Sequence, residues 1–141
     1  MRILILNGPN LNLLEKREAD KYGKLNLMEI QNIIEAEFTE DKFSFFQSNY
    51  EGELIEKIQL AENDFDALII NPGGYAHSSV AIRDALEIAE IIKIEVHLSN
   101  LSSRESFRQN LITASVCDGY ISGFQEKSYL AAVYLAKKIF A

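Results

Sequence analysis

Five short apolar runs, separated by stretches with the period of a helix, most limit how this 141-residue chain can fold. They cover residues 3–6, 43–47, 66–70, 94–98 and 116–121. The first and third runs are apolar at nearly every position, which is typical of strands buried on both faces of a parallel sheet. Strands that alternate with helices predict one α/β domain over residues 1–141. We expect a three-layer sandwich with a five-stranded parallel sheet, flavodoxin-like in arrangement.

Four helices are predicted from the spacing of apolar residues. Their buried stripes are expected to contain Leu27, Ile30, Ile34 and Phe38; Leu54, Ile58 and Ala61; Ile82, Leu86 and Ala89, with Ala85, Ile88 and Ile92 beside them; and Tyr129, Val133, Ala136 and Phe140. Asn26 followed by Glu29 predicts a capping box at the start of the first helix. Ser102 with Glu105 predicts another, which opens a short helix that includes Arg108.

Composition argues against several classes of function. The net charge of -7 does not suit a nucleic-acid surface. No apolar run approaches membrane-spanning length, and residues 3–6 are too short for the core of a signal peptide. The single cysteine, Cys117, cannot form an internal disulfide, so we expect a reduced, cytoplasmic location.

Polar residues gather where the predicted strands end, which is where open α/β sheets bind their ligands. After the third run the chain turns through Asn71-Pro-Gly-Gly and enters a helix, with His77 close to the turn. Along the fourth run Glu95, His97 and Ser99 share one face, because side chains alternate. A carboxylate beside an imidazole can orient the ring for proton transfer. For Glu95, His97 and Ser99, the alternative is an edge strand with one face in solvent. For His77 taken alone, the alternative is a residue that caps a helix or lies on the surface.

Arginines and asparagines also follow the strand ends. The arginines are Arg17, Arg83, Arg104 and Arg108, and the asparagines are Asn7, Asn10, Asn49, Asn71 and Asn100. Guanidinium groups suit carboxylates and phosphates, so the first set predicts a small-anion site. The alternative is ion pairs with nearby Glu15, Glu18, Glu87 and Glu105. The amides offer uncharged donors and acceptors to a hydroxyl-rich ligand, or they serve only the turns.

Residues 13–24 are mostly charged and lack a clear period, so we expect a long, mobile loop that acts as a lid. Tyr22 lies in this loop near Arg17 and Lys21. Nearby cations favour the phenolate form of a tyrosine, which can then serve as a base. A zinc site is not expected, because the chain lacks a cysteine cluster, a His-x-x-x-His pair and an obvious third ligand.

Several motifs occur along the chain in a fixed order. They are residues 7–14 (NGPNLNLL), Arg17-Glu18, Tyr22-Gly23, residues 47–49 (QSN), Glu51-Gly52, residues 71–73 (NPG), residues 79–84 (SVAIRD), residues 95–100 (EVHLSN), Arg104-Glu105 and Phe107-Arg108. Over nearly its whole length the chain therefore resembles the type II 3-dehydroquinate dehydratases, and the number of separate motifs makes the resemblance specific.

The resemblance implies removal of water from 3-dehydroquinate to give 3-dehydroshikimate in the shikimate pathway, by anti elimination through an enolate. In this family's scheme Tyr22 is the base, and Arg17 holds it as phenolate. Asn10 stabilises the enolate oxygen through a water. His97, oriented by Glu95, protonates the departing hydroxyl. The residues at the predicted strand ends suit this route, because no lysine is placed there to form an imine.

The resemblance also implies a substrate-binding set and an assembly. Asn71, His77, Ser99, Arg108 and the backbone of Leu98 would hold the hydroxyls and carboxylate of the substrate, and Asp84 would reach a neighbouring subunit's site. Trimers would assemble into a dodecamer, with no cofactor, no metal, and no nucleic-acid or membrane partner. Glu15 and Ala19 depart from the usual glycine and proline of the lid, so lid closure is expected to differ.

Two other classes of function remain open at this point. A flavodoxin-like cofactor module would want a Ser/Thr- and Gly-rich phosphate loop after the first strand, and a phosphorelay receiver would want an aspartate where Asn71 stands. An inactive homologue kept for binding or assembly is the other. The joint presence of Arg17, Tyr22 and His97 argues against it.

Overall fold

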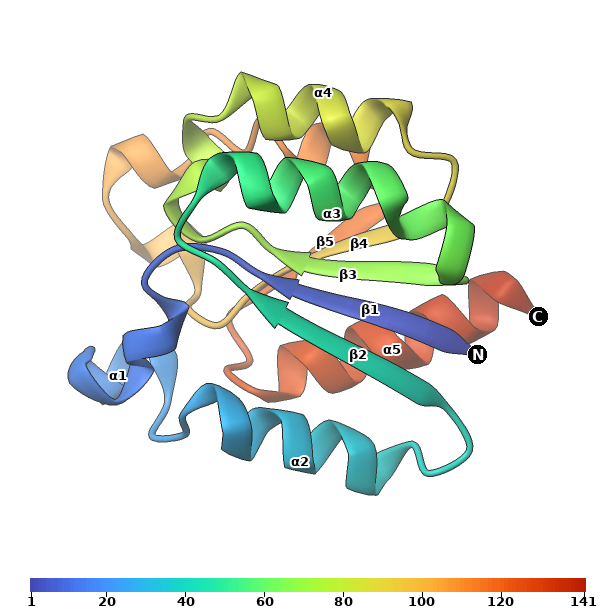
Figure 1. Cartoon of the computed structure of the whole chain (residues 1–141). Coiled ribbons are helices and arrows are strands. Elements are labelled where there is room, and N and C mark those ends of the chain that lie inside the picture. The colour runs from blue at the N-terminus through green and yellow to red at the C-terminus, as the bar shows by residue number, and fades with distance from the viewer.

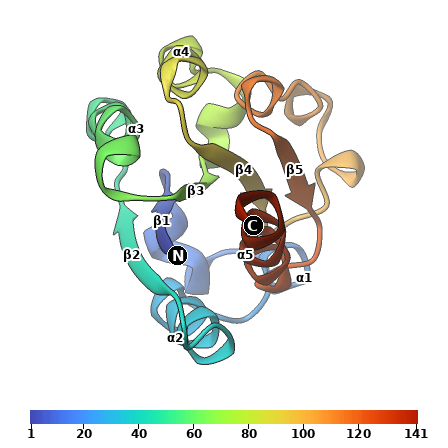
Figure 2. The same cartoon turned by 90° about the vertical axis from the view of Figure 1, so that its right-hand side faces the viewer.

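The computed structural model describes all of residues 1–141 and contains one five-stranded sheet in the order β2-β1-β3-β4-β5, with every neighbouring pair parallel (Figure 1). The strands are β1 (Arg2–Asn7), β2 (Lys42–Gln47), β3 (Ala67–Asn71), β4 (Ile92–His97) and β5 (Gly119–Ser122). Helices α2 (Leu27–Glu37) and α5 (Lys127–Phe140) cover one face, and α3 (Glu51–Asp64) and α4 (Val80–Ile88) cover the other (Figure 2). The expected three-layer α/β sandwich is confirmed. None of its helices has both the length and the apolar character needed to cross a membrane.

The sheet separates two apolar cores, and this explains why its strands are apolar at successive positions. Ile3 and Ile5 of β1 face the core under α2 and α5, whereas Leu4 and Leu6 face the core under α3 and α4. Side chains of an extended strand alternate, so a strand covered on both faces has to be apolar throughout. The helices contribute their expected stripes, which include Ile30, Ile34, Tyr129 and Val133 in the first core and Leu54, Ile58, Ile82 and Leu86 in the second.

The loops after β1 and β3 meet at the point where the strand order reverses, next to β1. Gly8 N donates to the Asn71 carbonyl at 2.7 Å, and a Cβ on Gly8 would lie 2.5 Å from the Pro72 carbonyl oxygen. Gly73 adopts φ +60, and a Cβ there would lie 3.0 Å from the Pro9 carbonyl oxygen. Both glycines are therefore required by the close approach of the two backbones. This contact fixes the edge of the sheet where α/β proteins bind ligands.

The fifth strand begins later than the run 116–121 predicted. Its pairing with β4 starts at Ile94 opposite Gly119, and Asp118 N donates to the Lys93 carbonyl at 2.8 Å just before it. Val116 instead ends the 3-10 turn Ala114–Val116 and packs against the core under α3 and α4. An apolar side chain that fills a core from a turn gives the same local pattern as one in a strand.

The segment expected as a long, mobile loop over residues 13–24 contains short helical elements. It contains a 3-10 helix, Leu11–Lys16, and the short helix α1, Ala19–Tyr22. Leu14 and Tyr22 are buried in the core under α2 and α5, which anchors the segment despite its many charges. The two short helices were not expected in this loop, and its mobility as a lid stays a prediction.

One of the two predicted capping boxes is present. Glu29 N donates to Asn26 Oδ1 at 2.9 Å and Asn26 N donates to Glu29 Oε1 at 3.2 Å, as expected. The box of Ser102 with Glu105 is wrong, because that carboxylate binds two arginines, Arg104 and Arg108, and two separate 3-10 turns replace the expected helix.

Two residues assigned to buried stripes also lie outside. Ile88 and Phe140, each at the end of its helix, are 76% and 55% exposed. In α5 burial ends at Ala136, before the turn that holds Phe140, whereas Ile88 lies between the buried Leu86 and Ala89 and points away from the core.

Replacing Gly8 with alanine is expected to destabilise the fold by about 1–3 kcal/mol, because the new methyl group would overlap the Pro72 carbonyl. Gly52→Ala is the matched control. Gly52 lies in α3 with nothing within 4 Å of its Cβ position, so alanine there should be neutral or stabilising by up to about 1 kcal/mol. Urea unfolding of both variants measures the difference, and equal stabilities would contradict the close approach.

Candidate active site

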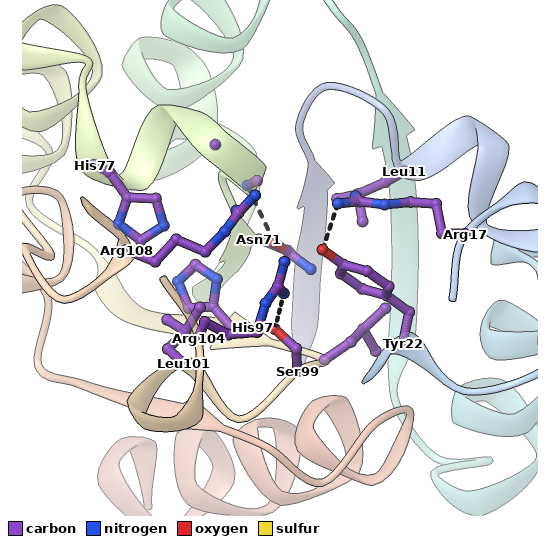
Figure 3. A pocket seen from close by; sticks show the side chains of 13 residues that line it. Leu11, Arg17, Tyr22, Asn71, His77, His97, Ser99, Leu101, Arg104 and Arg108 are labelled. Atoms are coloured by element: carbon purple, nitrogen blue, oxygen red, sulfur yellow. Dashed lines mark hydrogen bonds between the residues drawn. The ribbon is translucent and has the colours of Figure 1, made fainter. Parts of the chain in front are cut away.

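A pocket opens beyond the carboxyl ends of β1, β3 and β4, where the loops and 3-10 turns converge (Figure 3). Its lining consists of Leu11, Arg17, Tyr22, Asn71, Gly73, Gly74, His77, His97, Leu98, Ser99, Leu101, Arg104 and Arg108. Three arginines and no acidic residue line it, in a chain whose net charge is -7. The lining therefore favours a small anion, as the arginines predicted.

Tyr22 is held in the pocket by two guanidinium groups. Arg17 Nη2 donates to the Tyr22 hydroxyl, and the Arg17 Cζ lies 3.8 Å from the centroid of the tyrosine ring. The Cζ of Arg104 lies 5.2 Å from the same centroid. The ring is 9% exposed and packs in the core, so the hydroxyl has a fixed position. Tyr22 thus lines the pocket beside two positive charges.

Glu95 and His97 form a buried pair on β4. This strand lies inside the sheet, between β3 and β5, and the two residues are 0% and 5% exposed, so the solvated edge considered from the sequence is wrong. His97 Nε2 lies 2.6 Å from Glu95 Oε1, and Thr113 Oγ1 donates to Glu95 Oε2 at 2.7 Å. An ionised carboxylate only accepts, so Nε2 carries the hydrogen. His97 Nδ1 has no protein partner, and it is left for the pocket.

His77 lies on the 3-10 turn Gly73–His77, with its ring stacked on that of His97 at 6.2 Å between centroids (Figure 3). Its Nδ1 lies 3.0 Å from the Asn110 carbonyl oxygen, which can only accept, so Nδ1 carries the hydrogen. Burial lowers the pKa of His77, and the charges of His97 and Arg108 lower it further, against the opposing effect of the Asn110 bond. The ring is therefore neutral at pH 7, and Nε2 can accept from a ligand hydroxyl.

Asn71 ends β3 and its amide is fixed from both sides. Its Oδ1 accepts from Gly73 N at 3.1 Å, and its Nδ2 donates to the Tyr129 hydroxyl at 3.2 Å. Tyr129, fully buried on α5, donates in turn to Asn7 Oδ1 at 2.5 Å. The amide of Asn71 keeps one hydrogen for a ligand.

Arg104 and Arg108 have both roles considered from the sequence, since they pair with a glutamate and also line the pocket for an anion. Arg104 Nε and Arg108 Nε donate to the two oxygens of Glu105 at 3.1 and 2.7 Å, and the bond from Arg108 is the largest cause that lowers the pKa of Glu105 to about 2. Both arginines also line the pocket, and Arg104 Nη1 donates to Ser99 Oγ at 2.9 Å. The shared carboxylate orients the two guanidinium groups at the pocket wall.

Arg83 does not belong to this cluster. It lies on α4 and pairs with Glu87 at 3.0 Å and with Asp84 at 3.1 Å, so the ion-pair alternative is right for this residue. Its placement near the cleft was a wrong expectation, because a helix start in sequence does not say which way the side chain points.

Three of the expected site residues lie outside the pocket lining. Asn10 is exposed before the 3-10 helix Leu11–Lys16, with its backbone N bound to Asn49 Oδ1 at 3.0 Å. Asp84 is exposed on α4, and Glu95 lies beneath the pocket behind His97. The other eight line it: Arg17, Tyr22, Asn71, His77, His97, Leu98, Ser99 and Arg108.

Arg104 lines the pocket as the arginine cluster predicted, although the substrate-binding set did not include it. Sequence reasoning missed three contributors, of which Tyr129 looked like an ordinary stripe residue. Thr113 and the Asn110 carbonyl gave no signal, since one acts from a segment without motif and the other through its backbone. No group of three or more His, Cys, Asp or Glu side chains is arranged to hold a metal ion.

The fold and the pocket define a doubly wound α/β protein in which a tyrosine bound by arginine and a histidine bound by a carboxylate share a cationic pocket. The family model described as dehydroquinase class II matches residues 1–137, and the chain belongs to this family. The 3-dehydroquinate dehydratase of Thermotoga neapolitana is 45% identical, over 99% of this chain and 96% of the relative. That of Caldicellulosiruptor saccharolyticus is 48% identical, over 98% and 97%. The crystal structure of a type II dehydroquinase from Butyrivibrio crossotus superposes with a TM-score of 0.93, at 44% identity and 97% coverage of each chain.

Protonation of His77 is expected to weaken the fold. Because the pKa of His77 is lower in the folded chain than its usual value of about 6.5, the unfolded chain binds more protons just below that pH. The free energy of unfolding should therefore fall as the pH drops through about 6.5. His77→Asn should show a smaller fall in urea unfolding than the wild type, while Ser78→Asn, at an exposed neighbour, should keep it. An unchanged fall in His77→Asn would show that this ring is not the cause.

Proposed function

We propose that this protein dehydrates 3-dehydroquinate to 3-dehydroshikimate in the shikimate pathway. Membership of the class II dehydroquinases supports the reaction, as do relatives named 3-dehydroquinate dehydratase. The observation that carries the proposal is that one anion pocket holds both a tyrosine bound by arginine and a histidine bound by a buried carboxylate. Removal of water from a hydroxyketone needs such a base and acid around a small anionic substrate.

The elimination proceeds through an enolate. The phenolate of Tyr22, stabilised by Arg17, removes a proton from the carbon beside the ketone, and the C–H electrons form the enolate. Asn10 stabilises the enolate oxygen through a water. The enolate then collapses to the conjugated enone and expels the hydroxyl group on the next carbon. Proton removal and hydroxyl loss occur on opposite faces of the ring, which is an anti elimination.

His97 protonates the departing hydroxyl, so that it leaves as water. The proton comes from Nδ1, the ring nitrogen without a protein partner, while Nε2 keeps its hydrogen and its hydrogen bond to Glu95. The buried carboxylate stabilises the imidazolium that donates and keeps the ring in one orientation. The atoms and charges of the step balance. One proton moves from the substrate carbon to Tyr22, one moves from His97 to the departing oxygen, and the products are 3-dehydroshikimate and one water.

Substrate contacts follow from the donors and acceptors of the wall. Arg108 binds the carboxylate, and His77, Asn71, Ser99 and the Leu98 backbone bind the hydroxyls. The neutral ring of His77 supports its role as an acceptor. The polar wall thus distinguishes a polyhydroxylated acid from an apolar one.

An enolate route suits the pocket better than an imine route, which would need a lysine amine beside the ketone. No lysine lines the pocket. Lys93 Nζ, at the start of β4, donates to the Ala89 carbonyl at 2.6 Å, and Lys137 on α5 binds Asp41.

The enzyme works in the cytoplasm as a homo-oligomer, in which trimers assemble into a dodecamer. Asp84 reaches the site of a neighbouring subunit. The exposed position of its carboxylate on α4, bound only by Arg83, supports this role.

The first test is the absorbance of the conjugated enone that forms when 3-dehydroquinate is added. Tyr22→Phe is expected to lower kcat on the order of 10²–10⁴-fold, because the phenol that accepts the proton is lost. Tyr50→Phe, at a tyrosine that is 71% exposed, is the matched control and should keep full activity. Activity in Tyr22→Phe equal to wild type would remove the base role, and a folded wild type without turnover would make the chain a binding protein.

The same samples test the route. Sodium borohydride added during turnover should leave the mass of the chain unchanged, since no imine forms. A stable adduct of substrate mass would overturn the enolate route and leave the overall reaction standing.

Asp84→Asn is expected to lower kcat/KM about fivefold, the effect of one exposed ionic contact. Light scattering should give about 190 kDa for both wild type and variant, as for twelve chains of 16.0 kDa. Asp64→Asn, at an exposed aspartate without an ion pair, is the control. A monomeric, fully active wild type would contradict both the assembly and the shared site.

A further inference from the structure

The segment 110–113 contacts the elements that carry both histidines. The Asn110 carbonyl accepts from His77 Nδ1 at 3.0 Å. Ile112 N and Thr113 N donate to the Ala76 carbonyl at 3.0 and 3.4 Å, and these bonds fix the segment to the turn that carries His77. The Thr113 hydroxyl then reaches across to Glu95 on β4. One short stretch outside the pocket is thus hydrogen-bonded to the supports of both rings.

The Glu95 carboxylate has two protein partners, one on each oxygen. His97 Nε2 binds Oε1 at 2.6 Å and Thr113 Oγ1 binds Oε2 at 2.7 Å. With Glu95 and Thr113 both 0% exposed, bulk water does not replace either partner. A buried glutamate carboxylate that is held at one oxygen only can rotate about its Cγ–Cδ bond. Its negative charge is also less stabilised, because one hydrogen bond is missing.

Thr113 itself is held in place from its backbone. Val116 N and Cys117 Sγ contact its carbonyl at 3.3 and 3.6 Å, through the 3-10 turn Ala114–Val116. A β-branched side chain has few rotamers, so a fixed backbone gives its hydroxyl a fixed direction. The direction is toward Glu95, and the hydroxyl makes no other side-chain contact through hydrogen bonds.

We propose that Thr113 is a positioning residue for His97. By holding the second oxygen of Glu95, it keeps the carboxylate in the plane that binds His97 Nε2–H, and so keeps Nδ1 as the nitrogen that faces the substrate. The role rests on the proposed dehydration, in which His97 is the acid. Thr113 touches neither the pocket nor the substrate, so it acts only through Glu95.

The same segment relates the two imidazoles to each other. His77 is held by the Asn110 carbonyl and His97 by the chain from Thr113 through Glu95, and the stacked rings are 6.2 Å apart. The pocket therefore presents Nε2 of His77 beside Nδ1 of His97. The spacing of this pair is set from behind the pocket rather than by residues that line it.

Thr113→Val tests the role, because valine keeps the shape of threonine and removes only the hydroxyl. We expect kcat to fall about tenfold, the low end of what a hydrogen bond to a charged group contributes, with KM nearly unchanged. Thr113→Ser, which restores the hydroxyl, should recover most of kcat. The chain has one other threonine, Thr39, and Thr39→Val at this exposed position should match the wild type.

Histidine ¹⁵N NMR of the substrate-free protein provides a readout that does not depend on turnover. The two histidines give few signals, and the shifts distinguish a hydrogen on Nε2 from one on Nδ1. We expect the Nε2–H form of His97 in wild type and Thr113→Ser, and a mixture in Thr113→Val. If valine prevents folding, Thr113→Cys, with its weaker donor, should show the same change to a smaller extent.

The outcomes separate the two proposals. A wild type that does not turn over 3-dehydroquinate overturns the proposed reaction, while the NMR comparison still decides whether Thr113 fixes the ring. An unchanged ¹⁵N pattern and unchanged kcat in a folded Thr113→Val overturn the positioning role and leave the reaction intact. A fall in kcat that serine does not rescue assigns the effect to packing and also overturns it.

Discussion

The site depends on a charge that the sheet buries. β4 lies inside the sheet, where both faces are covered, yet it carries Glu95 at 0% exposure. A lone carboxylate in such a place is strongly disfavoured unless hydrogen bonds replace its water. The two oxygens are matched by one imidazole and one hydroxyl, so the polar side chains around this position are a condition of the fold as well as of the chemistry. Stability and proton transfer are thereby joined at one residue.

Two acceptors that are not themselves reactive decide what the two histidines present to the pocket. A backbone carbonyl takes the Nδ1 hydrogen of His77, and a carboxylate takes the Nε2 hydrogen of His97. Burial and nearby positive charge then favour the neutral form of His77. Two stacked imidazoles would repel if both were protonated, and the neutral form of His77 avoids this repulsion.

How far the sequence could predict all this depends on how local each signal is. The strands of the sheet and the capping box at Asn26 follow from nearest-neighbour patterns, and the alternation along β4 correctly put Glu95 and His97 on one face. The start of β5 was misplaced because an apolar residue in a turn fills the same core as one in a strand. Arg83 and Thr113 were misjudged or missed for one reason. Their partners are set by the direction of a side chain in space, which periodicity does not contain.

Tyr22 has a second consequence, since its ring belongs to the same core as the strands and α5 while its hydroxyl belongs to the pocket. The residue proposed to react is thus also part of the hydrophobic core that stabilises the fold. Most replacements at this position would remove core packing as well as the hydroxyl proposed to react. Selection for stability and selection for activity therefore act on the same residue. Divergence that abandons the reaction is then slow to erase the aromatic ring. A surviving aromatic ring here would, on its own, be poor proof of an active descendant.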